Sequence, residues 1–243
     1  MLMHNAPLYR IYFGDSRDKL FKKDLMDLKD KNLLDLEPFS KLKKRMEIEK
    51  LIFLHQVHGA KGLVIDSMEQ AKSIKPFVVE GDFIITDVAH VGVGIITADC
   101  LPVIFFDKRR QVIGIAHAGW RSSADHIVLK VVDQMQKNFG TRIEDLRVLF
   151  GPSAKVCCYR VGEDFLENFQ DFESLERVVQ RRDDGLYFDL PMFNMVLLEE
   201  LGIKKDQFVK DYNDCTVCDE SFFSHRRKGE QDDGRQMTIV SLS

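Results

Sequence analysis

The stretch that decides the fold is VGVGIITADCLPVIFFDKRRQVIGIAHAGWRS, residues 91–122. It contains three apolar, partly β-branched runs, VGVGIIT, LPVIFFD and QVIGIAH, which polar or turn-forming residues separate. β-branched residues favour strands, and runs without polar alternation are typical of strands that are buried on both faces. The stretch therefore predicts three successive buried strands.

Similar patterns continue on both sides of this stretch. Further strands are predicted at LIFLHQV (51–57), GLVID (62–66), FIITD (83–87), LRVLFG (146–151) and RQMTIVSLS (235–243). Helices are predicted at DHIVLKVVDQMQKNF (125–139), EDFLENFQ (163–170) and PMFNMVLLEEL (191–201). Crowded strands followed by interleaved helices predict an α/β (α+β) fold, with mixed β-sheets covered by helices in a sandwich-like arrangement.

Chain length favours one domain over residues 1–243, since 243 residues lie at the upper end of what one hydrophobic core supports. Residues 15–50 differ from the rest because they are rich in Lys, Asp and Glu. The leucines of DKLFKKDLMDLKDKNLLDL (18–36) are spaced about as one helical stripe requires. We interpret this segment as a peripheral, charged helix or two.

Composition excludes several classes of protein. Hydrophobic residues make up 44% and charged residues 30%, which is typical of a globular chain. The net charge of −4, without a dominant Lys/Arg block, argues against a nucleic-acid partner. The sequence has no export signal and no run of about 18 apolar residues, so no membrane association is predicted. Five cysteines, an odd number, indicate reduced thiols in the cytoplasm.

Three residues that can bind a soft metal fall at predicted strand ends. His58 follows LIFLHQV, Cys100 follows VGVGIIT, and His117 closes QVIGIAH. One thiolate and two neutral imidazoles form a ligand set that zinc accepts, and three protein ligands leave the fourth tetrahedral position open, as in catalytic zinc sites. The sequence therefore predicts a reactive zinc site at His58, Cys100 and His117, provided that these strands are neighbours.

Other histidines and cysteines are less informative. His55 lies three residues before His58, and along a strand the two side chains would point to opposite faces, so we assign only His58 to the site. Adjacent thiols on a strand diverge in the same way, and a lone CxxC is a weak indication of a zinc finger or redox motif. The roles of four cysteines stay open: Cys157, Cys158, Cys215 and Cys218.

Six segments, in order, resemble the signature segments of the YfiH family, also called the laccase-domain or DUF152 family. They are HQVHG (55–59), GDFIITD (81–87), ADCLPVIFFD (98–107), AHAGWRS (116–122), GPSAKVCCYRVG (151–162) and CTVCDESFFSHRRKGEQDDGRQM (215–237). The resemblance runs from about Leu51 to the C-terminus. It implies an α/β sandwich related to a bacterial toxin cysteine deamidase, with zinc bound by His58, Cys100 and His117.

The resemblance also implies an activity. Such proteins cleave purine nucleosides (adenosine, inosine, guanosine or methylthioadenosine) with phosphate to give the base and ribose 1-phosphate, and adenosine deamination accompanies this reaction. The implied partners are thus a small nucleoside and phosphate, with no obligatory protein partner. An older label for the family is copper-dependent polyphenol oxidase. Seven histidines are too few for several copper centres, so copper is disfavoured.

Phosphorolysis requires positive charge for phosphate. Arg121 follows the HAGW turn near a predicted helix start, where backbone N–H groups can assist its guanidinium. Further positive charge is expected from Arg226, Arg227 and Arg235. The carboxylates near the ligand segments, Asp99, Asp82 and Asp87, are candidates for orienting a histidine or handling a proton, and we include Asp99 with Cys100, His117 and Arg121 as catalytic.

Two other hypotheses stay open. Cys100 can act as the nucleophile of a hydrolase or amidase with His117 as its base, for example on cell-wall precursor peptides, a role that also resembles one attributed to some family members. Alternatively, the protein binds a metal and a partner without turnover. The segment FGDSRDKLFKKDL (13–25) departs from the Gly-, Ser- and Asn-rich opening of the family, which leaves the substrate undecided.

Overall fold

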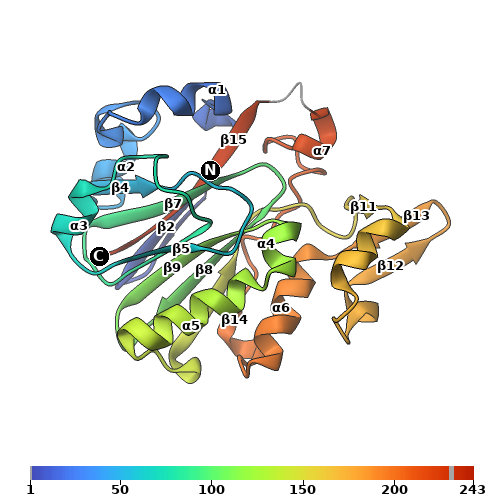
Figure 1. The fold of residues 1–243 in the computed structure, drawn as a ribbon. Coiled ribbons are helices and arrows are strands. Elements are labelled where there is room, and N and C mark those ends of the chain that lie inside the picture. Colours follow the sequence, from blue (N-terminus) through green and yellow to red (C-terminus); the bar gives the residue numbers. More distant parts are fainter. Residues whose placement is uncertain (1, 230–232) are drawn as a thin grey trace.

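Two six-stranded β-sheets packed face to face form the centre of the structure, a computed structural model that describes residues 2–229 and 233–243 (Figure 1). The first sheet has the order β1-β2-β15-β7-β4, with β3 also pairing with β15. Its strands are β1 (Leu2–Asn5), β2 (Tyr9–Phe13), β3 (Leu20–Phe21), β4 (Lys50–Phe53), β7 (Val91–Thr97) and β15 (Gly234–Leu242). Both sheets mix parallel and antiparallel pairs.

The second sheet has the order β14-β10-β8-β9-β6-β5. Its strands are β5 (Gly62–Ile65), β6 (Phe83–Thr86), β8 (Leu101–Asp107), β9 (Val112–Ala118), β10 (Leu146–Phe150) and β14 (Phe208–Val209). A small third sheet, ordered β11-β13-β12, extends from one side of the molecule (Figure 1). It consists of β11 (Arg160–Val161), β12 (Val179–Arg182) and β13 (Gly185–Phe188).

Helices cover the outer face of each large sheet. The α-helices are α1 (Lys22–Leu25), α2 (Ser40–Arg45), α3 (Met68–Ser73), α4 (Trp120–Ala124), α5 (Ile127–Phe139), α6 (Leu190–Glu200) and α7 (His225–Lys228). The 3-10 helices are Ser16–Asp18, Met26–Leu28, Leu33–Asp35, Ile143–Asp145, Glu163–Phe169, Leu175–Arg177 and Lys205–Gln207. Figure 1 shows α5 and α6 across the second sheet, and α1 and α2 beside the first.

Three hydrophobic clusters correspond to these layers. On β8, Ile104 and Phe106 pack into the cluster between the two sheets, whereas Val103 and Phe105 pack into the cluster beneath α5 and α6. The third cluster joins the outer face of the first sheet to the N-terminal helices. Successive strand residues point to opposite faces, so a strand in the middle layer is apolar on both. This explains the continuous runs in residues 91–118.

The structure confirms the predicted fold class and all eight predicted strands. Two features of the helices differ from prediction. The helix predicted at 125–139 is preceded by a separate short helix, α4, and His126 between α4 and α5 has a left-handed φ of 57°. Residues 163–169 form a 3-10 helix, which the apolar spacing alone does not distinguish from an α-helix.

Residues 15–50, interpreted above as a charged helix or two, form several short helical pieces. Their apolar stripe is buried all the same, because Leu25, Leu33 and Leu42 belong to the cluster on the outer face of the first sheet. Other elements were not predicted, among them the N-terminal hairpin β1–β2 and the hairpin β12–β13, of which β12 is exposed and β13 is buried. Within the described parts of the chain, no helix combines the length and the apolar character needed to cross a bilayer.

Candidate metal centre and active site

Three ligand-bearing segments meet where the two sheets are joined. Cys100 ends the connection from β7 in the first sheet to β8 in the second, and His117 lies next to the end of β9. Antiparallel pairing places Pro102 opposite His117, so these strand ends are adjacent. His58 lies in the connection from β4 to β5, which also passes from one sheet to the other. The ligand atoms of His58, Cys100 and His117 all lie within 4.8 Å of one another.

The position of His58 differs from the sequence interpretation. β4 ends at Phe53, so His58 lies in a turn, with a φ of 60°, and not on a strand. His55 forms only an isolated backbone bridge with Glu80, and its side chain is exposed. The structure therefore brings His58, and not His55, to Cys100 and His117 because of the turn.

Asp82 holds two of the three candidate ligands in place. Its carboxylate accepts a hydrogen bond from Nδ1 of His117 at 2.8 Å and from the backbone amides of Val57, His58 and Gly59. Asp82 is 1% exposed, so its carboxylate is shielded from water. The carboxylate fixes the ring of His117 with Nε2 available to a ligand, and it shapes the turn that carries His58.

The electrostatics of the centre favour a thiolate. Burial raises the pKa of Cys100, but the nearby His117 and His58 lower it more, so that its pKa falls below the ordinary value. Burial lowers the pKa of His117, whereas Cys100 and Asp82 raise it more, with a net increase. Cys100 is thus set up as an anion, the form in which sulfur binds metals or attacks electrophiles.

Gly119 leaves room beside the ligands. A Cβ atom at this position would lie 3.0 Å from Sγ of Cys100 and 3.4 Å from Cδ2 of His58. The backbone of Gly119, with φ −71° and ψ 170°, is open to any residue, so the constraint is one of space and not of backbone conformation.

We expect Gly119→Ala to weaken zinc binding by about tenfold while the fold is retained, because the added methyl group displaces two ligands by a few tenths of an ångström. Zinc affinity from competition with a chromophoric chelator measures the effect, and circular dichroism reports the fold. Gly59→Ala is the matched control, since its Cβ would make only ordinary contacts at 3.7 Å. Equal zinc affinity for both variants would contradict the expectation.

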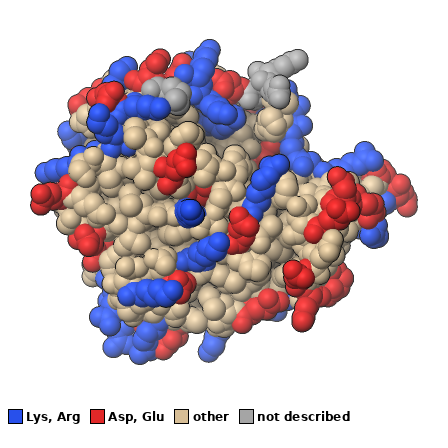
Figure 2. Space-filling model, in the orientation of Figure 1, with Lys and Arg blue, Asp and Glu red and all other residues tan. Residues whose placement is uncertain are grey.

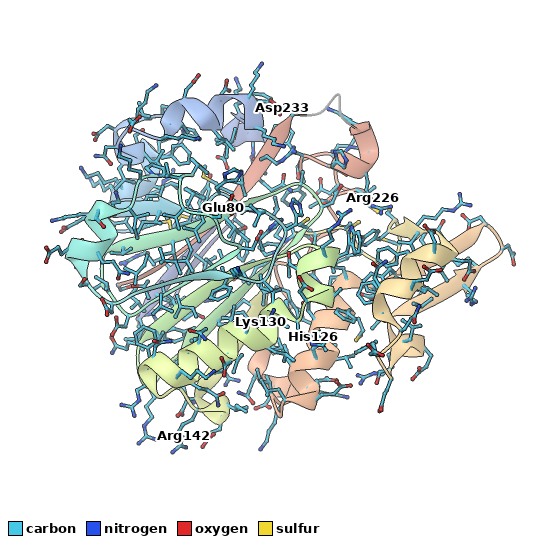
Figure 3. The ribbon with its side chains drawn as sticks, in the orientation of Figure 1. Glu80, His126, Lys130, Arg142, Arg226 and Asp233 are labelled. Carbon is cyan, nitrogen blue, oxygen red and sulfur yellow. The ribbon has the colours of Figure 1, made fainter. Side chains whose placement is uncertain are left out.

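An aromatic and cationic rim lies beside the three ligands. The guanidinium of Arg121 is 4.2 Å from the ring centroid of Trp120, and that of Arg226 is 4.0 Å from the ring centroid of Tyr159. The ring of Phe165 lies 5.3 Å from Trp120 and 6.1 Å from Tyr159. Arg226, which α7 carries towards the third sheet, also donates to the carbonyl of Arg160 in β11 (Figure 3). The sequence analysis did not identify Tyr159 and Phe165, because nothing in their sequence context distinguishes them from aromatic residues of the core.

Asp99 connects this rim to Cys100. Its backbone has a φ of 82°, and its carboxylate accepts hydrogen bonds from the Thr216 hydroxyl and the Arg226 amide, both at 2.7 Å. Asp82, and not Asp99, contacts a ligand histidine, while Asp87 is exposed. The structure therefore places Asp99 as a support for the Cys100 turn and for α7.

The last two candidate arginines lie in different surroundings. The guanidinium of Arg227 donates to the carbonyls of Thr216, Val217, Asp219 and Phe222, so its hydrogen-bonding groups hold a turn of the chain. Arg235 lies on β15 and donates to the carbonyl of Gly234. Residues 230–232, between α7 and β15, belong to the last family-like segment and lie outside the described residues.

The donor set fits a metal ion. Zinc binds sulfur at about 2.3 Å and imidazole nitrogen at about 2.0–2.1 Å, which places tetrahedral ligands roughly 3.5 Å apart. The ligand atoms of His58, Cys100 and His117 lie within 4.8 Å of one another, an upper limit that includes this spacing. The two imidazole rings are close neighbours, with centroids 4.7 Å apart in an edge-to-face arrangement.

Comparison with known proteins identifies the family. Residues 27–243 match the family model described as multi-copper polyphenol oxidoreductase laccase. The chain belongs to this laccase-domain (YfiH) family. A purine nucleoside phosphorylase of Clostridium acetobutylicum is 31% identical over 201 residues, covering 82% of this chain and 80% of that protein.

Two further relatives add to the picture of the laccase-domain family. An adenosine deaminase from an unknown prokaryotic organism is 29% identical, over 76% of this chain and 72% of that protein. The crystal structure of the hypothetical protein YfiH of Bacillus licheniformis has a TM-score of 0.75 and 28% identity, over 84% of this chain and 79% of that one. The YfiH-type fold is thus shared along most of the chain.

Proposed function

We propose that this protein is a zinc-dependent purine nucleoside phosphorylase with adenosine deaminase activity, and that His58, Cys100 and His117 hold the zinc. The observation that carries the proposal is the convergence of these three donors within 4.8 Å beside a rim of aromatic and arginine side chains. The activities for which the relatives are named support the choice of substrate.

Zinc bound at this site would supply Lewis acidity beside the substrate. The protein's own residues set up the centre. Asp82 accepts the Nδ1 proton of His117, which leaves Nε2 as the free ligand atom. His58 is exposed, so the site is open to solvent and substrate on that side. The older multi-copper description suits this chain less well, because the described residues offer only two groups of metal-binding side chains.

Phosphorolysis breaks the bond between C1′ of the ribose and the purine nitrogen and forms a bond from C1′ to a phosphate oxygen. The purine leaves with the bonding electron pair and takes up a proton. Arg226 and Arg121 carry exposed guanidinium groups at the rim, and a guanidinium suits a phosphate dianion geometrically. We propose that these two, and not Arg227, bind phosphate, because both terminal nitrogens of Arg227 donate to backbone carbonyls, four in all, whereas Arg226 donates to the carbonyl of Arg160 through one terminal nitrogen.

The aromatic rim suits the purine ring. The rings of Trp120, Phe165 and Tyr159 pack in sequence, with Trp120 and Phe165 half-buried and Tyr159 buried, and planar bases stack on exposed aromatic rings of this kind. Burial raises the pKa of Tyr159 to about 12, so its hydroxyl keeps its proton at neutral pH and can donate a hydrogen bond to a purine nitrogen. Lys and Arg are interspersed with Asp and Glu over the face in Figure 2, which is compatible with a small anionic substrate in one local site.

We expect purified, zinc-loaded protein to release adenine and ribose 1-phosphate from adenosine only when phosphate is present, and to release some inosine with or without it. Arg226→Gln should raise the KM for phosphate by about tenfold or more, because it removes a charge-assisted hydrogen bond. Chromatography of the products measures both effects. Release of neither adenine nor inosine would overturn the proposal.

The control for Arg226→Gln is Arg142→Gln. Arg142 is also an exposed arginine, and it lies near the far end of α5 from the site (Figure 3). An equal rise of the phosphate KM in both variants would point to a general effect of net charge and would remove Arg226 from the phosphate site.

A second candidate function has its own observation. The anionic sulfur of Cys100 beside His117 has the features of a nucleophile and its base, as in a cysteine hydrolase or amidase. Chelation separates the two functions. Activity that a strong chelator abolishes and zinc restores supports the phosphorylase, whereas chelator-resistant amide hydrolysis supports the cysteine hydrolase.

We further propose that residues 1–243 form one domain that works in the cytoplasm. The C-terminal strand β15 lies between the N-terminal β2 and the central β7, so both ends of the chain contribute to one sheet. The five cysteines are free, as thiols are in a reducing compartment.

A further inference from the structure

We infer that Cys157, Cys158, Cys215 and Cys218 form a second, structural metal site for a zinc-like ion bound by four thiolates. Their sulfur atoms all lie within 4.8 Å of one another, although two pairs of cysteines are about 60 residues apart in the chain. This site is separate from the centre at His58, Cys100 and His117 and does not depend on the proposed activity.

The backbone explains how adjacent thiols converge. Cys157 and Cys158 lie in a turn, where the amides of Cys158 and Tyr159 both donate to the carbonyl of Lys155. The strand geometry that would make neighbouring side chains diverge is therefore absent from this turn. An isolated backbone bridge between Ser153 and Cys215 brings the second cysteine pair alongside the first.

The sulfur separations fit four ligands of one ion. Sγ of Cys157 lies 3.5 Å from Sγ of Cys215 and 3.6 Å from Sγ of Cys218, and Cys158 lies 3.0 Å from Cys218. In a tetrahedral zinc site with Zn–S bonds of about 2.3 Å, sulfurs are roughly 3.8 Å apart. A disulfide requires about 2.05 Å, and all four thiols are free. The cluster thus has the spacing of a shared cation.

The surroundings also favour a bound cation with four anionic ligands. The backbone amides of Cys218, Lys155 and Val217 donate hydrogen bonds to the sulfur of Cys215. Amide donors to the first sulfur of a CxxC turn stabilise its thiolate. The ion and four thiolates would carry a net charge of −2, and two guanidinium groups lie close to compensate it.

Those two groups hold the two cysteine turns. Arg182 donates to the carbonyls of Val156 and Cys157, and Arg227 donates to those of Thr216 and Val217. Each arginine thus binds the backbone of a turn that carries one pair of cysteines. Binding of the ion exchanges four S–H protons, released to solvent, for four metal–sulfur bonds, with no change in oxidation state.

The site has a structural consequence for the active centre. Thr216, inside the CxxC turn, donates its hydroxyl proton to Asp99, the residue before Cys100. Tyr159, next to Cys158, stacks with Arg226. A metal at the four cysteines therefore fixes the turns that position the aromatic and cationic rim.

The test is metal stoichiometry of the full-length protein, purified under reducing conditions and reconstituted with Zn²⁺, Co²⁺ or ¹¹³Cd²⁺. We expect two ions per chain, with one ¹¹³Cd resonance in the range of four-sulfur coordination and another in that of mixed nitrogen and sulfur. Cys218→Ser should remove only the four-sulfur signal and lower the stoichiometry to one, while Cys100→Ser should remove only the other.

Several outcomes would overturn the inference. They are a single ion per chain with no four-sulfur resonance, four thiols that react with a thiol reagent equally fast with and without Zn²⁺, or a disulfide among these cysteines in peptide maps of the freshly purified protein. Because all of these measurements are made on the wild-type protein, the test survives a failure of Cys218→Ser to fold.

Discussion

Cys100→Ser should bind one metal ion fewer than the wild type and lose on the order of 10³-fold in kcat for adenosine phosphorolysis. A serine hydroxyl stays protonated at neutral pH, so it replaces neither the charge nor the metal affinity of the thiolate. The loss should be largest in kcat, because the arginine and aromatic rim that we propose for substrate binding is unchanged. Metal analysis and steady-state kinetics on the same preparation measure both effects.

The control for this variant is His55→Ala. His55 lies in the same connection as His58, but its side chain is exposed and outside the cluster of ligands. We expect wild-type metal content and activity for His55→Ala. Full metal content together with lost activity in Cys100→Ser would favour the cysteine nucleophile over the metal-dependent reaction.

Asp82→Asn should lower zinc affinity by about 10–100-fold and reduce the free energy of unfolding by about 1–3 kcal/mol. The buried carboxylate accepts hydrogen bonds from Nδ1 of His117 and from three backbone amides. An asparagine keeps one oxygen and presents an NH₂ group to the remaining donors, so buried N–H groups lose their acceptor. Zinc competition and urea denaturation measure the two effects.

Asp87→Asn is the matched control, because Asp87 directly follows β6 whereas Asp82 directly precedes it, and Asp87 is exposed. We expect no change in zinc affinity for the control. If Asp82→Asn destabilises the fold but leaves zinc affinity at the wild-type level, Asp82 supports the turn of His58 without orienting His117.

The middle layers of the fold were predictable from sequence because their strands are apolar on both faces. VGVGIIT, LPVIFFD and QVIGIAH correspond closely to β7, β8 and β9. The exposed strand β12, with the sequence VQRR, has no apolar alternation, so only its pairing with β13 defines it. The local sequence pattern thus predicts strands that are buried along their whole length. It does not predict a strand that only pairing with its neighbour defines.

The candidate site was also predictable only in part. The soft-ligand chemistry of His58, Cys100 and His117 and their places at strand ends pointed to a common centre. The choice of Asp82 over Asp99 and Asp87 as the partner of His117 depends on which strand ends lie together, and the sequence does not show this. The four-cysteine cluster was missed for a similar reason, because a turn and not a strand carries Cys157 and Cys158.

All three candidate ligands are held at one end of the second sheet: Cys100 directly precedes β8, His117 lies at the end of β9, and Asp82, directly before β6, binds the turn of His58. The pairing register of β6, β9 and β8 therefore sets the distances between the ligands, and a change of register in either pair would separate them. Over evolution, drift in the pairing of these strands is therefore constrained by coordination chemistry as well as by packing.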